Sequence, residues 1–522
     1  MSPAARRGGP PTTSAAPELI ASGFELENAD APILHRGFNL ADMAHVLDLS
    51  RRDIIPPDAA RALLALLLEV HEIDPADFPY APEFGESYNS RERFFVERIG
   101  DVAGWLHAGR PRREAARISL RLHLRAQIVR LVAEAASFAH EIVGVAGRHV
   151  DTMMADQTYL QQAQPSTFAH YLLSFAQPAL RDARRLVDEL DQINASPGGA
   201  GCVNGTRLQR DRAPLAQSLG FASVIPHTRD AMWRVDDLIS VLAVTNSMVS
   251  NLSKLAEDLE IFSSNEFDFV DLDDGFSRSS VLMPNKRNPY ALSIVRGASG
   301  VLIGRLSGFL AVVKSPSARS DNFIFAYGEV PRALDLSIRV TALMSGVVRT
   351  LKVHPDRMRE QLVRGYAQST DLAEHLTQVC HVDYRSAYQV VGDVVRAASR
   401  DGVPGTAVTA AMVNAAAQAR TGTSWGVSDA DLAPVLDPEQ IVASRQALGG
   451  AAPEPVRQML AMTSAAADDL ATLARQRRAA FTAAEQALVA RARAVVAAPA
   501  DIGSPAPSDT LPAPSTSPRS ET

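Results

Sequence analysis

Cysteine is almost absent from this sequence, since only Cys202 and Cys380 occur among 522 residues. Two cysteines cannot build a disulfide framework, and neither has metal-ligand spacing, so we expect a reducing, cytoplasmic location and no metal site. Aromatic residues are also scarce at 6%, whereas apolar residues, led by alanine, leucine and valine, reach 46%. This balance favours an aliphatic, all-α protein over a sheet sandwich.

A basic excess and long hydrophobic runs are missing as well. The net charge is −7 and the isoelectric point about 6.0, which argues against nucleic acid as the main partner. Ala59–Val70, which we take as the strongest apolar stretch, is shorter than the ~20 residues of a membrane span. Met1–Pro17 has no apolar run of signal-peptide length. We therefore expect no membrane segment, and the lack of a nucleotide or flavin signature predicts no cofactor.

Apolar residues recur at helical spacing through most of the chain. They predict two short helices within 38–72, broken at Pro56 and Pro57, because proline is tolerated only in the first turn of a helix. Long helices are predicted over 114–150 and 168–194, and a continuous run over 227–263 would be roughly 50 Å long. The glycine-rich segment 196–201 is interpreted as a structural bend, because no Gly-Lys-Ser/Thr follows it as in a phosphate-binding loop.

A polar loop from Arg278 to Pro289 separates two of the long helical segments and reads Arg-Ser-Ser-Val-Leu-Met-Pro-Asn-Lys-Arg-Asn-Pro. A serine six residues before a lysine, with Met-Pro between them and Asn-Pro after, resembles the signature loop of the fumarase, aspartase and argininosuccinate lyase superfamily. The resemblance implies that Ser280 is the base that removes a C3 proton from a succinyl group. It also implies that Lys286 and Asn288 hold the carboxylate that takes up the charge. An ordinary turn between helices is the alternative.

Such chemistry requires a cluster of this kind. A hydrogen next to a carboxylate is very weakly acidic, and its removal leaves a doubly charged aci-carboxylate that preorganised donors must stabilise. A serine hydroxyl is too weak a base unaided, so its surroundings must lower its pKa.

Two further strings resemble argininosuccinate lyases. Leu106–Glu114 matches their Leu-His-Thr-Gly-Arg-Ser-Arg-Asn-Asp, with Arg112 retained and Arg113 in place of asparagine. Two adjacent guanidinium groups form a carboxylate fork, although a basic cluster is more often solvated surface. Gln157–Phe168 matches their Thr-His-Leu-Gln-x-Ala-Gln-Pro. By the resemblance, Thr158 and Gln164 are expected to contact substrate.

The sequence departs from the family pattern around the leaving group. Tyr159 stands at the family's histidine, as a candidate catalytic acid, and Ser293 stands at the glutamate that pairs with that histidine. Tyr327 is retained as a substrate contact, whereas Arg278 and Arg332 replace a threonine and a glutamine. These arginines, with Arg113, are expected to bind substrate and to suit a small, anionic or carboxylated leaving group.

The resemblance implies an all-α, three-domain fold with a long central bundle, assembled as a homotetramer. In that family, each active site takes the regions around Arg112, Thr158 and Ser280 from three subunits. We expect a disordered segment at 1–20, an N-terminal helical domain at 21–113, the central bundle at 114–354, a C-terminal helical domain at 355–496 and a disordered tail at 497–522.

The sequence therefore predicts a C–N lyase of specialised metabolism that acts on a small dicarboxylate. It would eliminate a nitrogen-containing group from a 2-substituted succinate and release fumarate, with nitrosuccinate and an N-substituted aspartate as the two versions. The alternatives are argininosuccinate lyase proper and a non-catalytic, crystallin-like helical tetramer.

Overall fold

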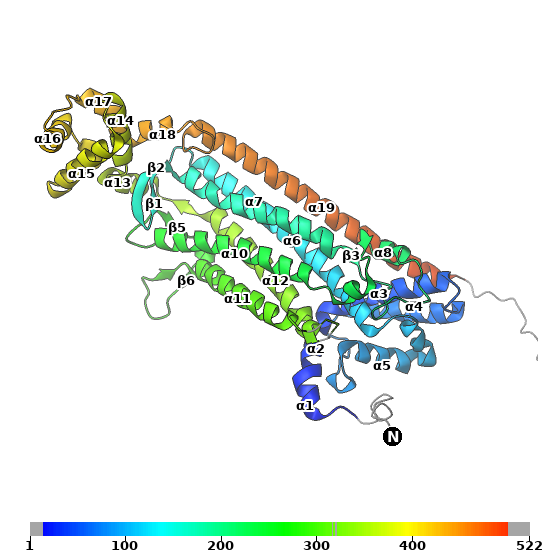
Figure 1. The fold of residues 1–522 in the computed structure, drawn as a ribbon. Coiled ribbons are helices and arrows are strands. Elements are labelled where there is room, and N and C mark those ends of the chain that lie inside the picture. The colour runs from blue at the N-terminus through cyan, green and yellow to red at the C-terminus, as the bar shows by residue number, and fades with distance from the viewer. Residues whose placement is uncertain (1–13, 316, 319–320, 499–522) are drawn as a thin grey trace, which may run out of the picture.

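The computed structural model describes residues 14–315, 317–318 and 321–498. Helices dominate this part of the chain, which confirms the all-α fold. Long helices run side by side as one bundle, with smaller helices gathered at its two ends (Figure 1).

The N-terminal end is built from short helices. They are α1 Pro17–Leu19, a π-helical turn Ile20–Phe24, α2 Glu25–Ala29, α3 Ala31–Arg51, α4 Pro57–His71, α5 Ser87–Ile99, and the 3-10 helices Pro82–Phe84 and Gly100–His107. The chain breaks between α3 and α4 where the two prolines predict it, because Pro57 occupies the first turn of α4. Pro17–Ile20 are helical although they fall in the predicted disordered segment, and residues 1–13 lie outside the described range.

Five long helices form the bundle, with two short ones beside it. They are α6 Arg112–Arg148, α7 Phe168–Ile193, α8 Ala213–Ser218, α9 Thr228–Trp233, α10 Asp236–Phe262, α11 Tyr290–Val313 and α12 Asp321–Thr350. The predicted run over 227–263 is wrong as one helix, because the chain leaves helical geometry at Arg234. At this break, the last carbonyl groups of α9 have no hydrogen-bond partners within the helix, as at the end of any helix.

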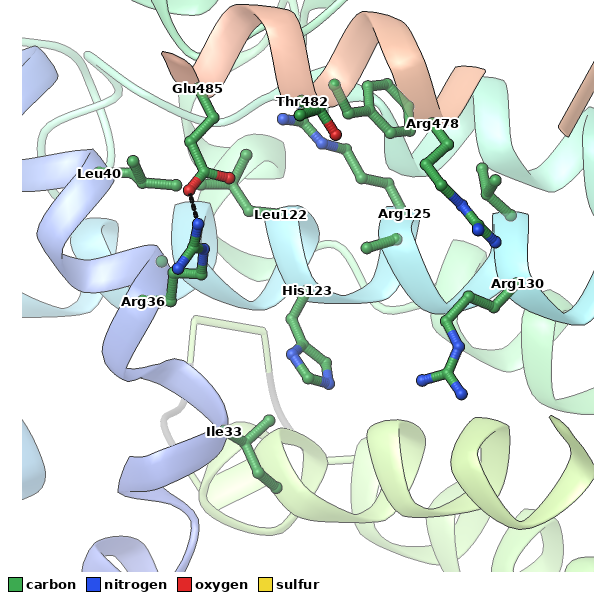
Figure 2. A pocket seen from close by; sticks show the side chains of 14 residues that line it. Ile33, Arg36, Leu40, Leu122, His123, Arg125, Arg130, Arg478, Thr482 and Glu485 are labelled. Atoms are coloured by element: carbon green, nitrogen blue, oxygen red, sulfur yellow. Dashed lines mark ion pairs between the residues drawn. The ribbon is translucent and has the colours of Figure 1, made fainter. Parts of the chain in front are cut away.

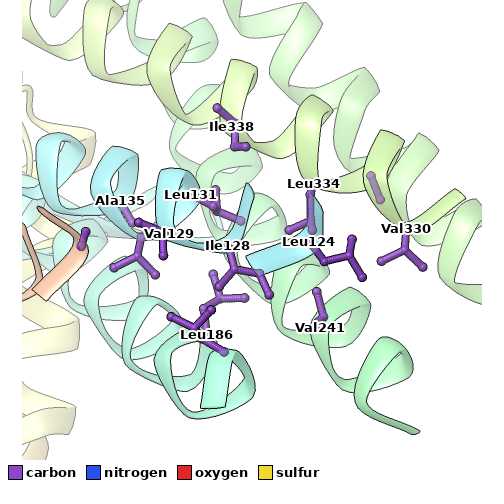
Figure 3. Packing of buried hydrophobic residues seen from close by; sticks show 14 of the residues in the cluster. Leu124, Ile128, Val129, Leu131, Ala135, Leu186, Val241, Val330, Leu334 and Ile338 are labelled. Atoms are coloured by element: carbon purple, nitrogen blue, oxygen red, sulfur yellow. The ribbon is translucent and has the colours of Figure 1, made fainter. Parts of the chain in front are cut away.

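The bundle core surrounds α6. Leu124, Ile128 and Leu131 point from α6 toward Leu186 of α7 and Leu334 of α12 (Figure 3). All five are at most 1% exposed. Burial of such a side chain contributes on the order of 2 kcal/mol, so the stripe fixes α6 along its length.

The C-terminal part divides in two. It consists of α13 Pro355–Arg364, α14 Ser369–Val379, α15 Tyr384–Arg400, the 3-10 helix Gly405–Ala407, α16 Ala410–Thr421, α17 Asp429–Leu436, α18 Pro438–Ser444 and α19 Pro453–Ala497. Helices α14 to α17 share a small core of their own. Helix α19, 45 residues long, runs back along α6 and α7 (Figure 1) and buries Val456, Leu470 and Leu488 in the bundle core. Within the expected domain at 355–496, α14 to α17 thus have their own core while α19 packs in the bundle core. Residues 499–522 of the expected tail lie outside the described range.

Strands occur only as two-stranded pairs within the described residues. The antiparallel pairs are β1 Met153–Thr158 with β2 Gln161–Thr167, β5 Val270–Asp271 with β8 Lys352–Val353, and β6 Arg278–Ser279 with β7 Arg287–Asn288. The pair of β3 Ala195–Ser196 and β4 Ser223–Val224 is parallel. A 3-10 turn, Asp274–Phe276, precedes β6.

Helix α11 combines length with an apolar composition, which the shorter stretch Ala59–Val70 does not. By length and composition it is apolar enough to cross a membrane, and only 28% of its most apolar window is buried in this chain. Val301 and Ile303 are about half exposed. The helix therefore presents an apolar face with no cover from its own chain.

Candidate active site

The signature loop is a hairpin, with Ser280 and Lys286 at the base of its tip. The backbone N–H of Ser280 donates to the carbonyl of Lys286 at 3.2 Å, and the N–H of Met283 donates to Ser280 Oγ at 3.0 Å. An N–H aimed at this oxygen stabilises negative charge on it, as a serine base requires. The Lys286 ammonium is exposed and has no ion-pair partner among the described residues.

Side chains flanking the tip hold the hairpin. Asn288 donates from Nδ2 to the carbonyl of Arg278 at 3.1 Å. Arg287 pairs with Asp274 at 2.6 Å and also with Asp271. The Arg278 guanidinium lies over the Tyr290 ring, 5.2 Å from its centroid. Arg278 and Asn288 thus lie in the same hairpin as Ser280.

The second predicted region forms the β1–β2 hairpin. Thr158 pairs with Gln161, and Gln164 pairs with Asp156 across the strands. The two turn residues, Tyr159 and Leu160, have φ of 54° and 58°, the geometry of a tight hairpin turn that usually employs Asn or Gly. A tyrosine there is uncommon, and its side chain is fully exposed. The turn therefore projects Tyr159 away from its own chain.

The third region lies at the start of α6. Arg112 and Arg113 each approach the carboxylate of Glu86 at 3.7 Å. Tyr327 of α12 is buried beside them, and its hydroxyl accepts a hydrogen bond from Arg117. Burial raises the pKa of Tyr327, while the charges of Arg117 and Arg113 lower it. Tyr327 and Arg113 thus belong to one cluster.

Two neighbouring residues of the segment Leu106–Glu114 have structural roles. Arg110 is buried and pairs with Asp42 at 2.5 Å. The Glu114 carboxylate accepts backbone N–H groups from Gly199 and Gly201 at 2.7 and 2.8 Å. Burial raises the pKa of Glu114 to about 7, against these hydrogen bonds and the charge of Arg110. The glycine-rich bend therefore holds a side chain of this protein, as expected for a structural bend.

Arg332, which the sequence predicts to bind substrate, is already ion-paired in this chain. It pairs with Asp30 at 2.6 Å and with Glu329 at 3.0 Å, and Glu329 also pairs with Arg305 at 2.6 Å. Two carboxylates thus already balance its charge in this chain. Binding of an anion by Arg332 would require that this network open.

One chain does not bring the three regions together. Helix α6 separates Arg112 from the β1–β2 hairpin, and its 37 residues span about 55 Å at 1.5 Å per residue. The β6–β7 hairpin lies toward the same end of the bundle as β1 and β2, away from α5 and the start of α6 (Figure 1). Arg112 and Thr158 of one chain therefore cannot touch the same small substrate.

The sequence also contains a signal that our prediction missed. Arginines recur every four residues at 113, 117, 121 and 125, which places them along one side of α6. Arg117, Arg121 and Arg125 are buried at 3 to 5% exposure. Glu86 gives no comparable signal, because only the fold brings it to Arg112.

A pocket of about 430 Å³ lies elsewhere, between α3, α6 and α19 (Figure 2). Arg36, Arg125, Arg130 and Arg478 give it a basic lining, and Arg36 pairs with Glu485. No predicted site residue lines it, so it is separate from the three regions. Among the described residues, no cluster of three or more His, Cys, Asp or Glu could hold a metal ion.

The chain is similar to lyases of known sequence. A lyase family model matches residues 51–304, and an argininosuccinate lyase C-terminal model matches residues 366–443. The argininosuccinate lyase of Methanosarcina acetivorans is 30% identical over 80% of this chain and 84% of its own length. That of Methanoculleus marisnigri is 32% identical over 80% and 84%, respectively.

Solved structures extend the likeness to the whole fold. EDDS lyase in complex with formate, and an EDDS lyase variant with bound fumarate, each superpose with a TM-score of 0.84 at 28% identity. The match covers 95% of this chain and 99% of theirs. Fumarate lyase from Mesorhizobium sp. BNC1, with a TM-score of 0.68 and 18% identity, shares the fold over 87% of this chain and all of its own. The chain therefore belongs to the fumarase and aspartase superfamily, near the argininosuccinate lyases, and is a fumarate-releasing C–N lyase.

Proposed function

We propose that the protein eliminates a small anionic group, bound through nitrogen, from a 2-substituted succinate. Nitrosuccinate, which would expel nitrite, and an aspartate whose nitrogen carries an acidic substituent are the two candidate substrates. The observation that carries the proposal is the β6–β7 hairpin, where Ser280 Oγ accepts the Met283 N–H and the nearby Lys286 has no ion-pair partner in the part of the chain that the structure describes.

Each of these residues has its own role in the proposed reaction. Ser280 takes the C3 proton, the C3–H electron pair becomes the C2–C3 double bond, and the C2–N pair leaves with nitrogen. Lys286 and Asn288 hold the substrate carboxylate that carries the transient charge, and one such donor contributes roughly 3 kcal/mol to the lowering of a barrier. Nitrite leaves as a stable anion and needs no proton, which fits the loss of the family's histidine and glutamate at Tyr159 and Ser293. An amine leaving group would take a proton, for which Tyr159 is the candidate acid.

We also propose that the active protein is a homotetramer with shared sites. The separation of about 55 Å along α6 supports this assembly, because another copy must supply the missing regions. The exposed face of α11 supports it as well, since Gly300, Gly304 and Gly308 leave open space for close approach of a second helix. Arg296 and Arg305 within α11 pair with Glu260 and Glu329, each at 2.6 Å.

Fumarate formation from a panel of 2-substituted succinates tests the proposal. We expect release from nitrosuccinate or from an acidic N-substituted aspartate, and negligible release from argininosuccinate. Ser280→Ala should reduce kcat more than tenfold, about 1.4 kcal/mol, with fold and assembly intact, and Lys286→Ala should be nearly as severe. Efficient cleavage of argininosuccinate would contradict the proposed leaving group, and no fumarate from any substrate would favour a non-catalytic protein.

A further inference from the structure

Three buried arginines on α6 differ in how their charges are satisfied. Arg121 pairs with the Asp237 carboxylate at 2.6 Å. Arg125 donates to Asn194 Oδ1 at 3.1 Å and to the carbonyl of Leu219 at 2.8 Å. Arg117, on the turn nearest the predicted site, has no carboxylate partner among the described residues.

The surroundings of Arg117 leave one nitrogen unused. Nε donates to the carbonyl of Met232 at 3.0 Å, in the last turn of α9, and Nη1 donates to the Tyr327 hydroxyl. Phe323 covers the guanidinium, whose carbon lies 3.3 Å from the ring centroid. Nη2 is buried without a hydrogen-bond partner in the described part of the chain. A buried, unpaired donor on a charged group is costly, so a partner is expected.

Two neighbouring side chains add donors of the same kind. Trp233, whose ring lies 5.7 Å from the Arg117 guanidinium carbon, has a buried Nε1–H that is also unpaired among the described residues. The Tyr327 oxygen accepts from Arg117, so its own proton is directed elsewhere. Arg117 and Trp233 offer only N–H donors and Tyr327 adds its O–H, so donors outnumber acceptors in this set. Only a group rich in acceptors satisfies such a set.

The charge around Arg117 also calls for an anion. Arg112 and Arg113 share the single carboxylate of Glu86 at 3.7 Å. Burial and the charge of Glu86 raise the pKa of nearby Glu27, which disfavours a second carboxylate charge there. Burial also lowers the pKa of Arg117 to about 10, which leaves it protonated at neutral pH.

We propose that Arg117, Tyr327 and Trp233 form the subsite that selects the leaving group, and that it takes a group with two oxygen acceptors, either a nitro group or a carboxylate. Arg117 supplies the charge, and the Tyr327 hydroxyl and the Trp233 indole supply neutral donors. This assignment rests on the proposed function, because it places the nitrogen side of the substrate next to Tyr327. It adds Arg117 and Trp233, which the sequence prediction did not include.

Binding to the inactive Ser280→Ala protein tests the subsite without turnover. The probes are N-(carboxymethyl)aspartate and N-(2-hydroxyethyl)aspartate, which are similar in length and differ in the terminal charge. Titration calorimetry should show at least about tenfold tighter binding of the carboxymethyl compound, the size expected for a hydrogen bond to a charged group. Equal affinity, or a preference for the hydroxyethyl compound, would overturn the proposal.

Substitutions assign the preference to the named residues. In the same background, Arg117→Met should abolish the preference, Arg117→Lys should retain part of it, and Trp233→Phe should reduce it while keeping the ring. Arg125→Met is the matched control, because Arg125 is another buried, ring-stacked arginine of α6 without a carboxylate hydrogen bond. The control should keep the full preference, and an equal loss in both arginine variants would mean a structural role only.

These outcomes separate the subsite from the reaction. If wild-type protein releases no fumarate but the binding preference depends on Arg117, the proposed function fails and the subsite stands. If fumarate is released and Arg117→Lys and Trp233→Phe both leave the preference unchanged, the subsite fails and the lyase stands. The two conservative variants keep this distinction even where Arg117→Met does not fold.

Discussion

At the scale of single residues, the sequence predicts which residues share a loop but not which residues pair across the fold. Ser280, Lys286 and Asn288 could be predicted because the loop itself sets their positions. The ion pair that occupies Arg332 could not, because its partner Asp30 lies 302 residues away in the sequence. The arginine repeat that includes Arg117 is present in the sequence, but the unpaired nitrogen of Arg117 becomes visible only when α9 and α12 pack against α6.

Tyr159 provides the sharpest residue-level prediction on the leaving group. Its side chain is fully exposed in the chain and stands where the family has an acid. If the group leaves as an anion, no proton is needed, and Tyr159→Phe should lower kcat by less than roughly tenfold. Steady-state kinetics on nitrosuccinate measures this. A much larger defect would restore Tyr159 as the acid and favour a substrate that leaves as a neutral amine.

His35 provides a prediction on pH. It is 1% exposed, and its ring bonds to the Tyr80 hydroxyl and the Val70 carbonyl. Burial and the charge of Arg91 lower its pKa to about 4, against an ordinary value near 6.5. The unfolded chain therefore gains a proton below pH 6.5 that the folded chain does not, and stability falls as the pH falls from 6.5 toward 4.

Replacement of His35 should remove this contribution. We expect His35→Gln to be less stable than wild type at pH 7 and the difference to shrink at pH 5, by up to about 1.4 kcal/mol per pH unit. Urea unfolding at one fixed protein concentration measures it. The control is His381→Asn at an exposed position. This variant should change the free energy of unfolding by the same amount at pH 7 and at pH 5. A difference that stays constant for His35→Gln would contradict the assignment.

At the scale of elements, the sequence predicted the helices well where packing and local signals agree. Pro57 starts α4, and the apolar spacing of 114–150 gave α6 to within two residues at each end. The run over 227–263 failed because its apolar spacing continues through Arg234, whereas Arg121 and Arg234 gather at Asp237 just after the break. The return of α19 along the bundle depends on long-range contacts that no local pattern encodes.

The prediction at the scale of elements concerns the exposed apolar face of helix α11. Val301 is 49% exposed on its apolar face, so Val301→Glu should place a charge in the proposed contact between copies. Burial of an unpaired charge is strongly unfavourable, and we expect a lower mass by light scattering together with lost fumarate release. Met462→Glu on α19 is the control, because Met462 is 63% exposed on another helix. A wild-type mass for Val301→Glu would exclude this face from the interface.

At the scale of the whole molecule, the chain is organised to place parts of a site far apart. The long α6 puts the Arg112 cluster at one end and the two hairpins toward the other (Figure 1). Closed symmetry brings such distant parts of identical chains together, because each interface repeats. The length of the bundle thus bears on the proposed function, and in the proposed assembly the apolar face of α11 would be the contact that aligns the copies.

Mixing of two inactive variants tests the shared site. Ser280→Ala and Thr158→Val remove groups from the two hairpins, and each variant alone should be inactive. If different copies supply the two groups to each site, random mixed assemblies contain about one quarter of sites with both groups intact, as expected for independent contributions from identical subunits. Fumarate release after co-expression of the two variants should then reach about a quarter of the wild-type rate per site. Variants that are purified separately and mixed under conditions where subunits do not exchange should release no fumarate. Absence of recovery in co-expressed assemblies of wild-type mass would place Ser280 and Thr158 of the same chain in one site, and the proposed sharing would be wrong for these two hairpins.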